Sequence, residues 1–170
     1  MNLSCVSQPM ETIISNTGPI IALAGINKLD ILKSFYKTVI IPEPVHTEIM
    51  AGGKAFAGLD EYKKATWLNV RELNHKPETL LVKLLDEGEA SVIHLALKLG
   101  IEKILMDERK GRRIARDVYG LIVTGTIKLL IDAKKAGLID NLTDALMEMK
   151  FSGYWIHDRI LQAAVKEVGE

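Results

Sequence analysis

The chain has 170 residues, of which 48% are hydrophobic and 26% are charged. These proportions are typical of one globular domain with enough apolar material for a core. The 22 basic and 22 acidic side chains give a formal net charge of +0, which excludes the strongly basic character of a protein that wraps DNA. Any site for nucleic acid must therefore be local.

The single cysteine, Cys5, excludes an internal disulfide, and it has neither a helix start nor basic neighbours that would make it a nucleophile. The first thirty residues lack the charged start, apolar stretch and cleavage site of a secreted chain. Charges interrupt every apolar run before the roughly 20 residues needed to cross a bilayer. We therefore expect a cytoplasmic protein with no membrane span.

Short β-branched runs alternate with longer segments of helical period, which predicts βα units around a mostly parallel sheet. The expected strands lie at 12–15, 39–41, 67–70, 103–106 and 121–123. The expected helices lie at 19–23, 29–35, around 45–49 with a stop at Gly52 and Gly53, 86–99 closed by Gly100, 108–119 closed by Gly120, 127–136, 141–150 and from 158 onward. A turn at 16–19, a partly helical insertion at 53–66 and an edge strand at 154–156 complete the pattern.

This order of elements predicts a three-layer α/β fold, in which helices flank both faces of a central, mostly parallel sheet. We expect one domain over residues 1–170, because no linker is long enough to divide the chain. Its core spans about 12–139, and a helical appendage spans about 140–170.

Ligands of open α/β sheets bind outside the carboxyl ends of the strands, so polar residues just after strands are candidates for a site. Asn16 and Asp107 both follow an expected strand. Glu89 lies in the first turn of its helix, and Glu48 lies in the helix after the second strand. Clustered carboxylates can hold Mg²⁺ or Mn²⁺ and activate water against a phosphodiester, because these cations prefer oxygen ligands.

Each of these residues also has an ordinary structural explanation. Asp86 could be the N-cap of a capping box in which Glu89 folds back, and the spacing alone favours that interpretation. Asp107 could cap the helix that follows it. Glu48 could be a solvated carboxylate, and Asn16 has the side chain of a turn residue.

The helix after Asp107 is predicted to present a face of arginine side chains: Arg109, Arg112, Arg113 and Arg116. Their spacings of three and four place them opposite the apolar set Ile114, Ala115 and Val118. Guanidinium groups can bind phosphate in a bidentate manner, and cations near a helix N-terminus oppose its macrodipole, which favours an anionic partner. The alternative is a solvated amphipathic face.

Four motifs, taken in order, resemble the successive signatures of PIN domains over about residues 12 to 139. They are Ile14-Ser15-Asn16-Thr17-Gly18-Pro19-Ile20, Pro44-Val45-His46-Thr47-Glu48, Gly88-Glu89-Ala90-Ser91, and Leu105-Met106-Asp107-Glu108-Arg109 with Gly111-Arg112 and Ala115. The match is closest to a prokaryotic subgroup of PIN-like proteins related to the toxin ribonucleases of toxin–antitoxin pairs. The resemblance implies a Mg²⁺- or Mn²⁺-dependent ribonuclease, often a homodimer and often neutralised by an antitoxin.

Carried over to this chain, the resemblance makes Glu48, Glu89 and Asp107 the catalytic, metal-binding acids and Thr17 a hydroxyl contact beside them. The first acidic position departs from the family, because Asn16 stands where aspartate is usual. An amide oxygen can coordinate a hard cation, but the lost negative charge should weaken metal binding.

Two main functions follow for the sequence. The first is an RNA endonuclease in which Asn16, Glu48, Glu89 and Asp107 bind the metal and the arginine face holds the RNA backbone. The second is a degenerate PIN domain that binds RNA or a partner protein without cutting. The reason for this hypothesis is Asn16, which stands in place of the usual aspartate. A metal-dependent phosphatase is disfavoured, because no Asp-x-Asp pair follows a strand.

Overall fold

The computed structural model describes residues 11–52 and 56–170, so Cys5 and Gly53 lie outside the described residues. Its sheet has five strands in the order β3-β2-β1-β4-β5, and all four pairings are parallel. The strands are β1 (Thr12–Ser15), β2 (Thr38–Pro42), β3 (Asn69–Arg71), β4 (Lys103–Leu105) and β5 (Ile122–Thr124). The predicted α/β fold with a mostly parallel sheet is confirmed.

The strand order places β1 at the centre, between β2 and β4. The chain runs outward from β1 through β2 to β3 and then returns to the other side of β1 for β4 and β5. Register pairs Ser15 with Leu105, so the carboxyl ends of β1 and β4 lie side by side. A sheet whose order reverses between two strands opens a crevice at that point, which is where ligands of this architecture bind.

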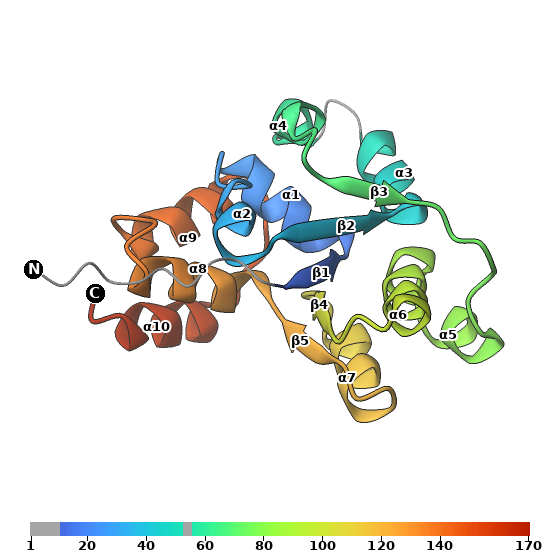
Figure 1. Ribbon diagram of the computed structural model, residues 1–170. Helices are drawn as coiled ribbons and strands as arrows, with labels where there is room; N and C mark the ends of the chain where they lie inside the picture. The colour runs from blue at the N-terminus through green and yellow to red at the C-terminus, as the bar shows by residue number, and fades with distance from the viewer. Residues whose placement is uncertain (1–10, 53–55) are drawn as a thin grey trace, which may run out of the picture.

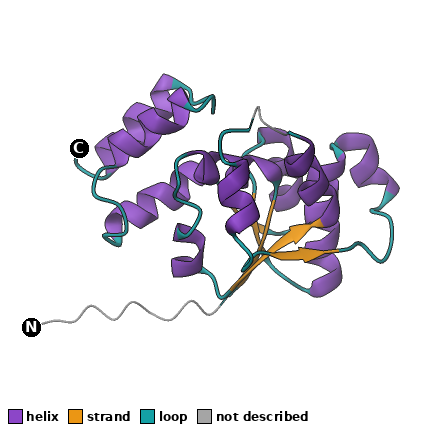
Figure 2. Ribbon diagram, turned by 90° about the horizontal axis from the view of Figure 1, so that it is seen from above, coloured by secondary structure: helices purple, strands orange, loops and turns teal. Residues whose placement is uncertain are grey.

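Helices flank the sheet (Figure 1), and the view from above shows helices on either side of the strands (Figure 2). Helix α6 contacts β1, β2 and β4, whereas α1, α2, α8 and α9 gather on the other side in Figure 1. The helices are α1 (Thr17–Gly25), α2 (Ile31–Phe35), α3 (Glu43–Ala51), α4 (Leu59–Lys64), α5 (Thr79–Leu84), α6 (Glu87–Leu99), α7 (Arg109–Asp117), α8 (Thr126–Lys135), α9 (Leu142–Phe151) and α10 (Asp158–Glu167). Within the described part of the chain, none of these helices has the length and apolar character needed to cross a bilayer.

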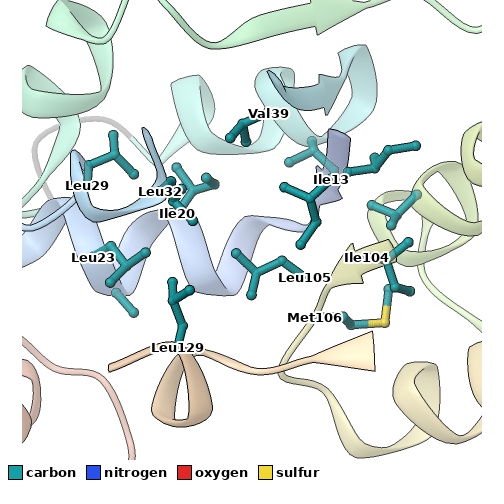
Figure 3. Close-up of a cluster of buried hydrophobic side chains, with 14 of the residues drawn as sticks. Ile13, Ile20, Leu23, Leu29, Leu32, Val39, Ile104, Leu105, Met106 and Leu129 are labelled. Atoms are coloured by element: carbon teal, nitrogen blue, oxygen red, sulfur yellow. The ribbon is translucent and has the colours of Figure 1, made fainter. Parts of the chain in front are cut away.

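One apolar core joins the sheet to the helices (Figure 3). Leu23 of α1, Leu105 of β4 and Leu129 of α8 are buried, and Figure 3 shows them gathered between the two helices and the sheet. Ile13 and Ile104 are fully buried because both faces of a parallel sheet are covered. The core therefore fixes the ends of β1 and β4, from which the polar residues of the crevice extend.

Several local signals in the sequence correspond to the structure. Asp86 is the N-cap of α6, and Gly100 ends that helix in the left-handed conformation at φ 65°, which glycine adopts without a Cβ penalty. The turn expected at 16–19 is wrong beyond Asn16, because α1 already begins at Thr17. Pro19 fits in the first turn of α1, because backbone N–H groups there have no acceptor within the helix. The N–H that proline lacks is therefore not missed.

Two predictions about short elements fail. Helix α5 was not expected, because its six residues between two loops carry too little periodicity to stand out. The edge strand expected at 154–156 is wrong: the segment has no strand partner and forms a connection between α9 and α10. Its β-branched and aromatic residues are used instead for packing and side-chain contacts, with Ile156 buried.

The last two helices are tied to the rest of the fold. Helix α10 contacts both α8 and α9. The Glu170 carboxylate accepts hydrogen bonds from the backbone N–H groups of Leu142 and Thr143 at 2.9 and 2.8 Å. These bonds lower the pKa of Glu170 to about 2, so its charge is present at neutral pH at the N-terminus of α9.

A close approach between α1 and the start of α4 leads to a stability prediction. A Cβ at Gly58 would lie 2.4 Å from the carbonyl carbon of Ala24 and 2.5 Å from the nitrogen of Gly25. Both are backbone atoms that cannot turn aside, so we expect Gly58→Ala to lower the free energy of unfolding by about 1–3 kcal/mol. Urea denaturation measures the loss.

The matched control for that substitution is Gly25→Ala, at the facing end of α1. Its new Cβ would meet the Ser152 Cβ at 3.6 Å, an ordinary contact, and alanine is the better helix former. We expect unchanged or slightly higher stability. An equal loss in both variants would show that the close backbone approach at Gly58 is not the cause.

Candidate metal-dependent nuclease site

The first turn of α1 is the centre of the candidate site. Asn16 follows β1 and is the N-cap of α1, and its backbone N–H donates to the Leu105 carbonyl at 2.9 Å. The residue is only 5% exposed, yet its Oδ1 is buried and has no hydrogen-bond partner among the described residues. A buried acceptor without a donor is costly, and an unseen water or cation is a common explanation.

A second oxygen reaches the same place from α3. A Cβ added at Gly88 would lie 3.0 Å from Asn16 Oδ1 and 3.1 Å from Glu48 Oε2, with Asp86 Oδ1 at 3.4 Å. Three oxygens from three different elements thus converge on one glycine in the first turn of α6. A Cβ at Gly88 would press on these oxygens, which gives this residue a role that the sequence did not reveal.

Thr17, the first residue of α1, positions Glu48. Its hydroxyl donates to Glu48 Oε2 at 2.5 Å. Thr17 is buried, whereas Glu48 as a whole is exposed with one oxygen turned inward. The expected proximity of Thr17 to the acidic residues is present, and its hydroxyl is engaged with one of them.

Asp107 approaches α1 from the β4 side. Its Oδ2 lies 3.6 Å from where a Cβ of Gly18 would be. The alternative that it caps the following helix is wrong, because Glu108 is the N-cap of α7. Asp107 instead accepts from the Thr126 backbone N–H at 2.7 Å and from the Thr126 hydroxyl at 2.6 Å, which places it at the N-terminus of α8.

Tyr154 adds a third donor to that carboxylate. Its hydroxyl donates to Asp107 Oδ2, and burial, followed by the charge of Asp107, raises the pKa of Tyr154. The phenol therefore remains a proton donor at neutral pH. Asp107 is held in one orientation by groups from α8 and from the segment between α9 and α10.

Glu89 makes the capping box that its spacing predicted. Its backbone N–H donates to Asp86 Oδ1 at 2.7 Å, and its Oε2 accepts from the Asp86 backbone N–H at 3.2 Å. Its Oε1 points toward α7, 2.6 Å from where a Cβ of Gly111 would be. Glu89 is therefore buried between the start of α6 and α7.

The buried position of Glu89 predicts a pH dependence of stability. Burial, followed by the charge of Asp86, raises the pKa of Glu89 above its ordinary value of 4.5. Between the unfolded and the folded pKa, the folded chain binds more protons, so stability falls as pH rises through that window. We expect Glu89→Gln, which keeps the capping acceptor, to be more stable than the wild type at pH 7 without metal.

Denaturation at several pH values above 4.5 measures this effect. In Glu89→Gln, the free energy of unfolding should fall less steeply as pH rises than in the wild type. Glu87→Gln is the control, because Glu87 lies in the same helical turn but is exposed. A wild type whose stability rises with pH across the window would contradict the prediction.

The arginine face divides into one inner and three outer side chains. Arg112 is half-buried and donates from Nη1 to the Met106 carbonyl at 2.8 Å. A Cβ at Gly125 would touch both this Nη1, at 2.6 Å, and Asp107 Oδ1, at 3.1 Å. Arg112 therefore lies beside Asp107. The remaining arginines are exposed: Arg109, Arg113 and Arg116.

The apolar side of α7 is narrower than expected. Ile114 and Ala115 are buried, as predicted, but Val118 is 58% exposed. The helix ends at Asp117. Val118 is the C-cap and keeps helical backbone, but it lies past the part of the helix that the core covers. Arg116 is paired with Asp117 at the surface, at 2.9 Å, and this exposed pair contributes little to stability.

An apolar cleft of about 360 Å³ adjoins the candidate site without containing its acids. Ile21, Ala22 and Phe56 line it, and Tyr154 is the residue that it shares with the surroundings of Asp107. Sequence reasoning missed Tyr154 and Thr126, because neither belongs to a local motif and both reach Asp107 from distant parts of the chain.

The oxygen donors at the candidate site are of the type that a hard cation prefers. Within residues 11–52 and 56–170, no three or more Asp, Glu, His or Cys side chains are grouped as metal ligands. The adjacent oxygens of Asn16 and Glu48, one of them without a partner, are nevertheless the donor type that Mg²⁺ and Mn²⁺ prefer. Asp107 faces the first turn of α1, and Glu89 uses only its Oε2 in the capping contact.

The family model described as a PIN domain matches residues 12–170, which extends the similarity through the C-terminal helices, beyond the expected limit near residue 139. No curated protein and no solved structure was found to match the chain. PIN domains are generally nucleases that use divalent metals. With the match covering nearly the whole chain and the parallel α/β sheet in place, this protein belongs to the PIN-domain family.

Proposed function

We propose that the protein is an endoribonuclease dependent on Mg²⁺ or Mn²⁺, weakened by Asn16 at the first acidic position. The unpartnered Oδ1 of Asn16, buried beside Glu48 Oε2, is the observation that carries this proposal. An oxygen pair of this kind suits a cation, because a cation removes the cost of the lone acceptor and the local excess of negative charge.

The residues of the candidate site would have two roles, which are metal binding and the positioning of the carboxylates. Asn16, Glu48, Glu89 and Asp107 would hold the metal. Such a cation supplies Lewis-acid stabilisation and an activated water at a phosphodiester. Thr17 fixes the Glu48 carboxylate by its hydroxyl, and Thr126 and Tyr154 fix that of Asp107.

The arginines of α7 would bind the phosphates of the RNA. Arg112 lies next to Asp107 and would contact the phosphate nearest the metal, since both groups border Gly125. The exposed side chains of Arg109, Arg113 and Arg116 would hold the backbone farther along. This division explains how a chain of formal net charge +0 could bind RNA locally.

We further propose a cytoplasmic, toxin-type ribonuclease that forms a homodimer and is neutralised by an antitoxin protein. Exposed apolar side chains support a protein partner, because a monomer rarely leaves a run of them in water. Helix α5 carries three such side chains: Leu80, Val82 and Leu84, which are 50%, 57% and 37% exposed.

The test is incubation of the purified protein with single-stranded RNA in the presence of Mn²⁺. We expect degradation that stops when the metal is chelated with EDTA. Binding of Mn²⁺ followed by calorimetry, without RNA, provides a readout that does not depend on turnover. Absence of both cleavage and metal binding at millimolar Mn²⁺ would refute the nuclease proposal.

A second function is supported by Asn16 and by the lack of a three-carboxylate group in the described residues. It is a non-catalytic PIN domain that binds RNA or a partner protein. Retention of RNA in a binding assay, with no cleavage at any Mn²⁺ concentration, would favour this alternative.

A further inference from the structure

An exposed tryptophan stands beside the candidate site. Trp155 is 78% exposed in the segment that joins α9 to α10. It lines a surface hollow of about 460 Å³ together with Tyr154 and His157, and with Lys150 and Asp158 at the rim. Leaving so large an aromatic side chain in water is unfavourable, which makes its exposure a feature to be explained.

The segment that carries Trp155 is fixed on both sides. The Tyr154 backbone N–H donates to the Met149 carbonyl at 3.0 Å, and Ile156 is buried in the core. His157 is the N-cap of α10 and accepts from the Arg159 backbone N–H at 3.2 Å. The indole is therefore presented by an ordered backbone.

The geometry of the rings leaves a flat aromatic surface available. The rings of Trp155 and His157 meet edge to face, with centroids 5.9 Å apart and planes at 85°. At the rim, Lys150 Nζ and Asp158 Oδ1 pair at 2.9 Å and remain accessible. A π-face bordered by one donor and one acceptor of opposite charge matches a nucleobase, which has a flat face and a polar edge.

The hollow and the proposed site are linked through Tyr154. Trp155 is the next residue after Tyr154, with Cα atoms about 3.8 Å apart, and the Tyr154 hydroxyl contacts Asp107. We propose that Trp155 stacks on a base of single-stranded RNA whose neighbouring phosphate reaches Asp107. This inference rests on the proposed ribonuclease function and adds a base-binding subsite to it.

Tryptophan fluorescence can test the subsite without cleavage. Of the two tryptophans, Trp67 is half-buried with Lys33 Nζ over its ring at 5.3 Å. In a Trp67→Phe background, emission reports on Trp155 alone. We expect a short single-stranded oligoribonucleotide, added in EDTA, to quench this emission to saturation, whereas an abasic oligonucleotide of the same length should not.

Affinity measurements on two variants complete the test. Stacking on Trp155 predicts that Trp155→Ala weakens oligoribonucleotide binding by about tenfold and that Trp155→Phe recovers most of it. Phe151→Ala is the matched control, since Phe151 is 85% exposed nearby but does not line the hollow. An equal weakening by Phe151→Ala would overturn the proposal.

Two further outcomes separate this proposal from its alternatives. Quenching in EDTA without cleavage in Mn²⁺ would refute the nuclease function and leave the base subsite supported. An emission change that follows protein concentration rather than RNA would assign the surface to a second copy of the chain and overturn the subsite. Cleavage with no quenching would likewise overturn it while the nuclease function stands.

Discussion

Asp107→Asn is expected to reduce Mn²⁺-dependent RNA cleavage by about 10²–10³-fold. The substitution removes a negative charge where β4 ends, beside Arg112 and the first turn of α1. It leaves the size of the side chain unchanged. An amide oxygen can still accept from the Thr126 backbone N–H, and the new NH₂ group can donate to the Tyr154 hydroxyl, which can turn.

The fold should therefore survive Asp107→Asn, and the thermal midpoint separates loss of chemistry from loss of structure. Asp144→Asn is a suitable control, because Asp144 lies in the first turn of α9 at a solvent-exposed cap far along the chain. Equal activity of wild type and Asp107→Asn would show that the cleavage comes from a contaminant or from another site.

Asn16→Asp should strengthen the binding of metal to the candidate site. A carboxylate at this buried position would face Glu48 Oε2, and both burial and the like charge would raise its pKa. Without metal, we expect the free energy of unfolding to fall by about 1–3 kcal/mol. With Mn²⁺, the added charge becomes attractive, and the half-saturating metal concentration should fall by about tenfold.

Thermal denaturation with and without Mn²⁺ measures both halves of this prediction, because a ligand that binds only the folded state raises its stability. Asn141→Asp is the matched control: Asn141 is also an N-cap asparagine, but it is exposed and its side chain already accepts from the Asp144 N–H at 2.8 Å. A variant at Asn16 whose midpoint does not respond to Mn²⁺ would remove this position from the metal site.

The fold was predictable where the signal is local and strong. The strand at 12–15 is confirmed to the residue, and Gly100 closes α6 because a left-handed residue is needed there. Helix α5 and the connection at 154–156 were missed because short apolar segments have no periodicity that separates helix, strand and loop. In the connection, burial of Ile156 and the Tyr154 contact replace strand pairing.

The candidate site was predictable only in part. The order of strands and motifs put Asn16, Glu48, Glu89 and Asp107 in one candidate site. In the structure, oxygens of Asn16 and Glu48 approach Gly88, and Asp107 faces the first turn of α1. The sequence could not reveal that Thr126 and Tyr154 hold Asp107, because those contacts span 19 and 47 residues and depend on tertiary packing. Nor could it decide which way the Glu89 carboxyl would turn.

The strand order has a consequence for the synthesis of this chain on the ribosome. β1 pairs with β4, and their partners Ser15 and Leu105 lie in opposite halves of the sequence, so closing this pair is a slow, nonlocal step. The donor that completes the environment of Asp107 is Tyr154, 47 residues farther along the chain. A growing chain therefore lacks the finished pocket until Tyr154 has been synthesised and its segment has folded back onto β4.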